Sequence, residues 1–231
     1  MNLDLSGQKA VAIVSGGLDS VTLAHLLHHQ GVQLHLLAFD YGQKHKKELE
    51  FARQCADRLD AAFDVVDLSG FSGLISNSAL TSAEVEVPHG HYAAPNMAVT
   101  VVPNRNAILL AMAYGVAVNE EAQIVATGVH GGDHFIYPDC RPEFIKAFHA
   151  MEKKATEGFA DPQLRLLAPF LEVDKTAIVR IGNDLKVPFK RTWSCYEGNA
   201  LHCGKCGTCV ERREAFALAG VQDPTEYANT V

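Results

Sequence analysis

Residues 10–27 read AVAIVSGGLDSVTLAHLL and decide the fold. An apolar run ends at Ser15-Gly16-Gly17, and an apolar helical pattern follows almost at once. Glycine permits a tight turn and a close approach of the backbone to a ligand, because it tolerates positive φ and has no Cβ. The helix that follows begins with unpaired N–H groups at the positive end of its dipole, which suit an anion. We therefore expect this strand, loop and helix to hold a phosphate.

The composition narrows the class of protein. With 231 residues, 48% of them hydrophobic, the chain is long enough for one α/β domain with a small appendage. A formal charge of −7 argues against binding nucleic acid over the whole surface. We find no run of about 18 apolar residues and no secretory signal pattern. The sequence therefore predicts a cytoplasmic protein that acts on small molecules, with no nucleic-acid or membrane partner.

Apolar runs alternate with helical patterns along most of the chain. The predicted strands are 9–14, 33–39, 62–68, 123–129 and 164–170, and the predicted helices are 21–29, 46–59, 106–118, 143–157 and 175–186. This alternation predicts an α/β fold with a Rossmann-like parallel sheet covered by helices on both faces. Residues 70–103 break the rhythm, and a connection of that length is typical of a lid or binding loop.

Four of the six cysteines are close together near the C-terminus. Cys195, Cys203, Cys206 and Cys209 are spaced C-x7-C-x2-C-x2-C. In a reducing compartment this clustering favours a metal over disulfides, and four thiolates complete a tetrahedral zinc site. We expect one structural zinc per chain. An iron–sulfur cluster is the main alternative, because C-x2-C-x2-C also opens a ferredoxin motif, although the C-x3-C-P continuation is missing. Disulfides or free thiols are the third reading.

The string SGGLDS, 15–20, resembles the SGGxDS signature of the PP-loop ATP pyrophosphatases, and it is neither a Walker A loop nor GxGxxG. In that superfamily, whose fold is adenine nucleotide alpha hydrolase-like, the loop holds the pyrophosphate part of ATP while the α-phosphorus is attacked. A tight turn without a ligand is the alternative. The resemblance implies ATP contacts at Val14, Ser15, Gly16, Gly17, Leu18, Asp19, Ser20, Val21, Thr22, Leu23, Ala24 and Phe39. It divides the chain into an ATP-binding domain, 1–190, and a zinc module with a closing helix, 191–231.

Five further motifs, in order, resemble the 7-cyano-7-deazaguanine synthase family of the queuosine pathway. They are FDYGQKH (39–45), VPNRNAILLAMA (102–113), YPDCRPEFI (137–145), APFLEVDKTAIV (168–179) and the cysteine module (192–216). The resemblance implies a ligase that converts 7-carboxy-7-deazaguanine and ammonia to 7-cyano-7-deazaguanine through an adenylated carboxylate and an amide. It also implies ATP with Mg²⁺ as co-substrate and a homodimer. The chain departs from the family at Asn104, where glycine is usual, and at Phe135-Ile136, where Ser-Gly is common.

Four residues are candidates for the chemistry, each with a structural alternative. Asp19 would bring Mg²⁺ to the phosphates or be a helix N-terminal acid. Arg105 would bind the substrate carboxylate or form a structural ion pair. Asp133 follows two glycines after a strand and would line the site or cap a turn. Lys175 would reach a phosphate or be an exposed helix lysine.

Weaker candidates and rival functions stay open at this stage. Arg141 and Asp139 are further candidates for substrate contacts, and His45, His130 or His134 could take a proton from ammonium, with none favoured. One rival function is a PP-loop tRNA-modifying enzyme such as a thiolase. The negative net charge and the assignment of the four clustered cysteines to a metal site disfavour it. The other is a nucleotide-binding or zinc-module interaction protein without turnover.

Overall fold

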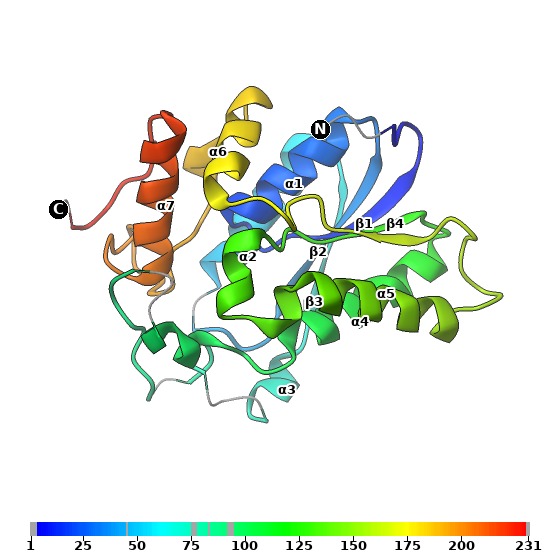
Figure 1. Cartoon of the computed structure of the whole chain (residues 1–231), viewed down its shortest axis with the longest axis horizontal. Coiled ribbons are helices and arrows are strands. Elements are labelled where there is room, and N and C mark those ends of the chain that lie inside the picture. The colour runs from blue at the N-terminus through cyan, green and yellow to red at the C-terminus, as the bar shows by residue number, and fades with distance from the viewer. Residues whose placement is uncertain (1–3, 45, 75–77, 83, 92–94, 230–231) are drawn as a thin grey trace.

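A computed structural model describes residues 4–44, 46–74, 78–82, 84–91 and 95–229 (Figure 1). Within these residues the core is a five-stranded parallel sheet in the order β3-β2-β1-β4-β5. The strands are β1 (Lys9–Ile13), β2 (Gln33–Asp40), β3 (Ala62–Asp67), β4 (Ile124–Ala126) and β5 (Arg165–Leu167). The predicted Rossmann-like α/β sheet is therefore confirmed. Strands β4 and β5 are shorter than the apolar runs, 123–129 and 164–170, from which they were predicted.

Helices follow the strands as predicted. They are α1 (Leu18–His29), α2 (Lys47–Leu59), α3 (Ser69–Ser72), α4 (Arg105–Asn119), α5 (Pro142–Ala155), α6 (Lys175–Asp184) and α7 (Gly207–Ala219). Short 3-10 turns cover Pro95–Thr100 (η1), Gly131–Phe135 (η2), Pro138–Cys140 (η3) and Phe189–Arg191 (η4). Helix α1 begins three residues before the predicted start at 21, because Asp19 and Ser20 belong to its first turn although they are polar.

Alternate residues of each strand face two different helical layers. Ala10 and Ala12 of β1 pack into a core shared with α1, α2, α6 and α7, whereas Val11 packs into a second core shared with α4 and α5. Figure 1 shows α1 and α6 above the sheet and α4 and α5 below it. This period of two is what a sheet covered on both faces requires.

Helix α4 has the composition of a membrane span but the packing of a core helix. The segment Met97–Asn119 is the one described helix that matches a span by length and composition, with a hydropathy of 1.3, although the sequence predicted none. Leu110, Ala113 and Ala117 of this helix are buried in the core below the sheet. A buried helix in a parallel α/β protein needs the same apolar composition.

The C-terminal segment folds back onto the body of the protein. The Arg212 side chain of α7, 1% exposed, donates to the carbonyl of Phe189 at 3.0 Å and to Ser194 Oγ at 3.0 Å. The Trp193 N–H donates to the carbonyl of Gly16, in the loop after β1, at 2.9 Å. Residues on both sides of the predicted boundary at 190 therefore share one set of contacts, and the division into two parts stays a prediction.

Candidate active site

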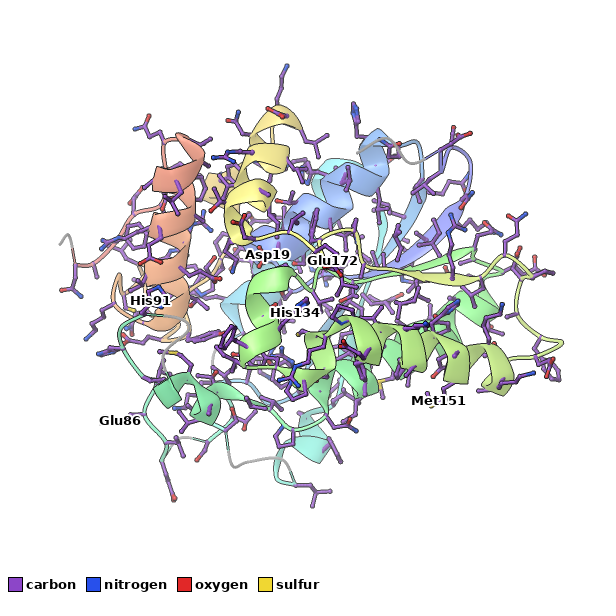
Figure 2. All side chains as sticks on the ribbon, in the orientation of Figure 1. Asp19, Glu86, His91, His134, Met151 and Glu172 are labelled. Carbon is purple, nitrogen blue, oxygen red and sulfur yellow. The ribbon has the colours of Figure 1, made fainter. Side chains whose placement is uncertain are left out.

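A cavity of about 250 Å³ opens at the carboxyl ends of the strands. It is lined by the loop after β1, the ends of β2 and β4, the starts of α2, α4 and α6, and residues 193–196 of the C-terminal segment. Open α/β sheets place ligands at this edge, at the point between β1 and β4 where the strand order reverses. In Figure 2, Asp19 lies near the centre of the molecule, whereas Met151 on α5 lies at its edge.

The loop after β1 is held by its own serines. The backbone N–H of Ser15 donates to Ser20 Oγ at 3.2 Å, and the N–H of Gly17 donates to Ser15 Oγ at 3.3 Å. Gly17 is the N-cap of α1, and no side chain in the described part of the chain caps this helix. Leu18, Asp19 and Ser20 of its first turn line the cavity, and the unpaired N–H groups of a helix N-terminus suit an anion.

Gly16 is needed for a reason that the sequence did not reveal. Its φ is +84°, and a Cβ at this position would lie 2.3 Å from the Glu48 carbonyl oxygen and 2.8 Å from the Ala52 nitrogen. Both atoms belong to the backbone of α2, so the close approach is to a helix and not to a ligand. The glycine therefore fixes how α2 packs on the loop.

The predicted ATP contacts divide into two groups. Val14, Ser15, Gly17, Leu18, Asp19, Ser20 and Phe39 line the cavity. Gly16, Val21, Thr22, Leu23 and Ala24 do not line it, since the helix turns these last four into the core. Thr22 Oγ1, for example, would lie 3.1 Å from a Cβ at Gly182 of α6. Direct contact of this second group with a nucleotide has no support from the geometry.

Lys175 connects the loop to the C-terminal module. Its Nζ lies 3.2 Å from Asp19 Oδ2 and 2.6 Å from Glu211 Oε2. Burial disfavours the charged form of Lys175, but the carboxylates of Asp19 and Glu211 outweigh this effect and raise its pKa. Glu211 belongs to α7 and was not among the predicted site residues. Glu211 lies inside the cysteine module, 192–216, but the motif did not assign it to the site, because only the packing of α7 on α6 brings it to Lys175.

His130 completes this group, the loop cluster, which consists of Asp19, His130, Asp133, Lys175 and Glu211. The imidazole is 1% exposed, and its Nδ1 accepts a hydrogen bond from the Gly132 N–H at 3.1 Å. Its Nε2 lies 3.8 Å from Asp19 Oδ2 and 3.6 Å from Asp133 Oδ2. Because Nδ1 accepts a hydrogen bond, Nε2 is the ring nitrogen that can donate toward these two carboxylates. Of the other two candidate histidines, His134 does not line the cavity and His45 lies outside the described residues.

One oxygen in the loop cluster is left without a protein partner. Asp19 Oδ1 is buried and accepts no hydrogen bond from the described residues. An unsatisfied buried oxygen is costly unless a ligand supplies the missing contact. Carboxylate oxygens are the ligands that Mg²⁺ prefers. The oxygen therefore fits a cation that accompanies phosphates.

A second group, the tyrosine cluster, lies on the same cavity and consists of Tyr41, Glu48, Arg105, Tyr137 and Tyr196. Burial raises the pKa of Tyr41 to about 12 and that of Tyr196 well above its ordinary value, so both phenols are neutral. The Arg105 guanidinium carbon lies 5.8 Å from the centre of the Tyr41 ring. No carboxylate of the described residues lies within 4.0 Å of this guanidinium. The structural ion pair considered for Arg105 is thus not found among them.

The residues next to Arg105 orient the start of α4. Asn104 adopts the left-handed conformation, with φ 58° and ψ 17°. Glycine adopts this conformation readily and asparagine tolerates it, so the turn is kept although glycine is replaced. Asp139 Oδ2 accepts from the Asn106 N–H at 3.0 Å, and Arg141 Nε donates to the His134 carbonyl at 2.9 Å. Asp139 and Arg141 do not line the cavity, whereas Asp133 does.

The four clustered cysteines meet in space. The sulfur atoms of Cys195, Cys203, Cys206 and Cys209 all lie within 4.8 Å of one another, and all four side chains are buried. All six cysteines belong to the described part of the chain, and each is free. The cluster could hold a metal ion, as the spacing predicts, and Cys195 also lines the cavity.

Comparison with known proteins now identifies the family. The family model described as "Queuosine biosynthesis protein QueC" matches residues 9–220. The chain belongs to this family. A protein of Rhizobium leguminosarum bv. trifolii (strain WSM2304) named 7-cyano-7-deazaguanine synthase is 57% identical over 219 residues, which cover 95% of this chain and 92% of the relative. A protein of Brucella ovis with the same name is 56% identical and covers 95% and 93%.

A solved structure supports the same fold at much lower sequence identity. NMN synthetase from Francisella tularensis is 13% identical, with a TM-score of 0.52, and the match covers 94% of this chain and 79% of that one. At this identity the likeness shows the fold alone.

Proposed function

We propose that the protein is a ligase that converts 7-carboxy-7-deazaguanine, ATP and ammonia to 7-cyano-7-deazaguanine. The observation that carries the proposal is the family match over residues 9–220. The cavity supports it, because it combines an uncapped helix N-terminus beside Asp19 and Lys175 with a cation, Arg105, that has no carboxylate partner among the described residues. One side suits phosphates and the other suits an organic acid.

The chemistry must overcome a carboxylate that is a poor electrophile. Transfer of AMP from ATP to the carboxylate releases pyrophosphate and gives an acyl adenylate, whose leaving group is AMP. Ammonia then attacks the carbonyl carbon and gives an amide. A second ATP transfers AMP to the amide oxygen and releases pyrophosphate, and loss of AMP with the remaining N–H protons gives the nitrile. In such steps a protein chiefly positions the reactants and stabilises charge on the phosphates.

The residues divide this work between them. The first-turn N–H groups of α1 would bind the phosphates, and Lys175 would neutralise charge that develops there. Asp19, through its unpartnered oxygen, and Asp133 would hold Mg²⁺, which would supply positive charge to offset that of the phosphates. Arg105 would bind the substrate carboxylate by its fork of N–H donors.

The cysteine cluster is proposed to hold one structural zinc per chain. A tetrahedral ion with Zn–S distances of about 2.3 Å places its ligand sulfurs about 3.8 Å apart. Cys203 Sγ and Cys209 Sγ are 3.9 Å apart, and no pair in the cluster exceeds 4.8 Å. A four-iron cluster is larger than a single ion and separates its cysteine sulfurs further, so the spacing favours zinc. A homodimer in the cytoplasm, without a nucleic-acid or membrane partner, completes the proposal.

Mass spectrometry and metal analysis test the proposal directly. The purified protein, incubated with ATP, Mg²⁺, ammonium and 7-carboxy-7-deazaguanine, should form the nitrile and release AMP and pyrophosphate. Omission of either the acid or ammonium should abolish nitrile formation. Pyrophosphate release that ignores the deazaguanine acid would contradict the proposed function. Metal analysis should find about one zinc per chain and no visible absorption, and a brown iron-containing protein would contradict the zinc assignment.

A further inference from the structure

Glu48 is a carboxylate on the cavity wall that the proposed mechanism does not use. It lies in the first turn of α2, is partly buried and lines the cavity beside Tyr41 and Arg105. Gln43 Nε2 donates to Glu48 Oε1 at 3.0 Å. The amide of Gln43 is itself fixed, because it also donates to the Phe39 carbonyl at 3.1 Å and accepts from the Tyr41 N–H at 2.9 Å. The carboxylate is therefore held in place by a rigid neighbour.

The charge of Glu48 is poorly compensated by the protein. No lysine, arginine or histidine nitrogen of the described residues lies within 4.0 Å of its carboxylate. Burial raises its pKa to about 7, and Arg105 and Gln43 only partly oppose this rise. A buried carboxylate without a cation is costly, and such groups are typical of ligand sites. Glu48 therefore lacks hydrogen-bond donors that a ligand can provide.

The hydrogen-bonding edges of the two possible ligands, the guanine-type base of the substrate and the adenine of ATP, decide which of them suits Glu48. A guanine-type base presents two adjacent donors, the ring N1–H and the 2-amino group, and an ionised carboxylate is an acceptor at both oxygens. Adenine presents a donor beside an acceptor, so its ring N1 would face a carboxylate oxygen without a proton between them. The hydrogen bond from Gln43 leaves most of the acceptor sites of the carboxylate available.

We propose that Glu48 reads the N1–H and 2-amino edge of the deazaguanine substrate, while Arg105 on the same cavity binds its carboxylate. The assignment rests on the proposed function, and it gives the tyrosine cluster one group for each polar edge of that molecule. Gln43 is then a positioning residue, which orients the Glu48 carboxylate without touching the substrate.

A cycle of one substitution and one change in the ligand tests the assignment. The variants are E48Q, which is nearly isosteric, and E50Q as a matched control, because Glu50 is exposed on the same helix. The two ligands are 7-carboxy-7-deazaguanine and the analogue that lacks the 2-amino group. KM for each ligand, KM for ATP and kcat are measured on the zinc-loaded protein, with binding of each base by calorimetry.

We expect E48Q to lose the preference for the guanine-type ligand over the analogue without the 2-amino group, with no effect on ATP. Wild type and E50Q should prefer the guanine-type ligand by roughly 10- to 100-fold, as a bidentate pair gives, and E48Q should prefer it by less than about threefold. KM for ATP should stay unchanged. A raised KM for ATP would assign Glu48 to the adenine, and a lower kcat with full discrimination would assign it to proton transfer; either result overturns the proposal.

Two further readouts keep the test decisive if E48Q does not fold. E48D retains the carboxylate, so it should retain a preference for the guanine-type ligand at reduced affinity. Wild type alone must also discriminate between the two ligands. If wild type forms nitrile but binds both bases equally, the role of Glu48 fails while the proposed function stands. If neither base yields nitrile, the proposed function itself fails.

Discussion

Lys175 and Arg105 are both partly buried cations on the wall of one cavity, yet their surroundings differ. Lys175 in the loop cluster lies between two carboxylates, Asp19 at 3.2 Å and Glu211 at 2.6 Å. Arg105 in the tyrosine cluster lies among neutral phenols, with no carboxylate of the described residues within 4.0 Å. A cation that is paired in the protein is held in position for a ligand that brings several charges and its own metal ion. Arg105 has a hydrogen bond to Tyr41 but no carboxylate partner among the described residues, so its positive charge is left for a single carboxylate. The comparison predicts that the two clusters respond differently to substitution.

Loss of the metal should impair the loop cluster and the tyrosine cluster together, because the C-terminal segment contacts both of them. Trp193 bonds to the loop through Gly16, and Tyr196 belongs to the tyrosine cluster. Structural zinc supplies folding free energy on the order of 10 kcal/mol, so C206S should lose zinc, melt at a much lower temperature and bind neither ATP nor the base. Calorimetry and thermal melting measure this, with C55A, outside the cluster, as control. A C206S protein that still binds one ligand tightly would show that the clusters are independent.

Substitution of Asp19 should affect the loop cluster alone. D19N keeps the shape but removes a charge that faces Lys175 and the proposed Mg²⁺. We expect kcat/KM for pyrophosphate release to fall by about 10²- to 10³-fold, the scale of one lost transition-state contact. Affinity for the base should change little. D57N, an exposed acid on α2, is the control, and equal losses in ATP and base binding in D19N would contradict the separation.

Substitution of Arg105 should affect the tyrosine cluster alone. R105K keeps the charge but loses the planar fork, so KM for the deazaguanine acid should rise by about 10- to 100-fold. KM for ATP should stay within about twofold of wild type. Steady-state kinetics with each substrate varied in turn measures both values. A rise in KM for ATP alone would place the nucleotide, and not the acid, against the tyrosines.

The smallest effect concerns stability and pH at Glu48. Because the folded pKa of about 7 exceeds the ordinary value of 4.5, the folded state binds more protons between these pH values, and stability falls as pH rises through this window. E48Q cannot lose this proton, so it should be more stable than wild type by roughly 1–3 kcal/mol at pH 8 and nearly equal at pH 4. Urea unfolding at the two pH values, with E50Q as control, checks this. A destabilised E48Q at pH 8 would mean that Arg105 compensates the charge in the folded protein.

The sequence predicted what short-range patterns encode. The alternation of strands and helices along the chain, the SGGLDS loop and the spacing of the four cysteines are all patterns of residues close together in the chain. Glu211 and Glu48 were missed because tertiary packing brings them to the cavity: α7 must dock on α6, and α2 must pack against Gly16. The same packing explains why Gly16 lies beside a helix where the sequence predicted a ligand. Asn104 was noted only as a departure from the usual glycine, and its left-handed backbone is one that asparagine tolerates.

The ion pair between Lys175 and Glu211, and the hydrogen bond between Gly16 and Trp193, have a consequence for how the protein matures. The loop after β1 is synthesised before its partners in the C-terminal segment, because Gly16 precedes Trp193 and Glu211 in the chain. The sheet can form early, but a chain without the C-terminal segment, or without a metal in the cysteine cluster, lacks one side of the cavity. We therefore expect newly made protein to bind its ligands only after α7 has been synthesised and has docked on α6.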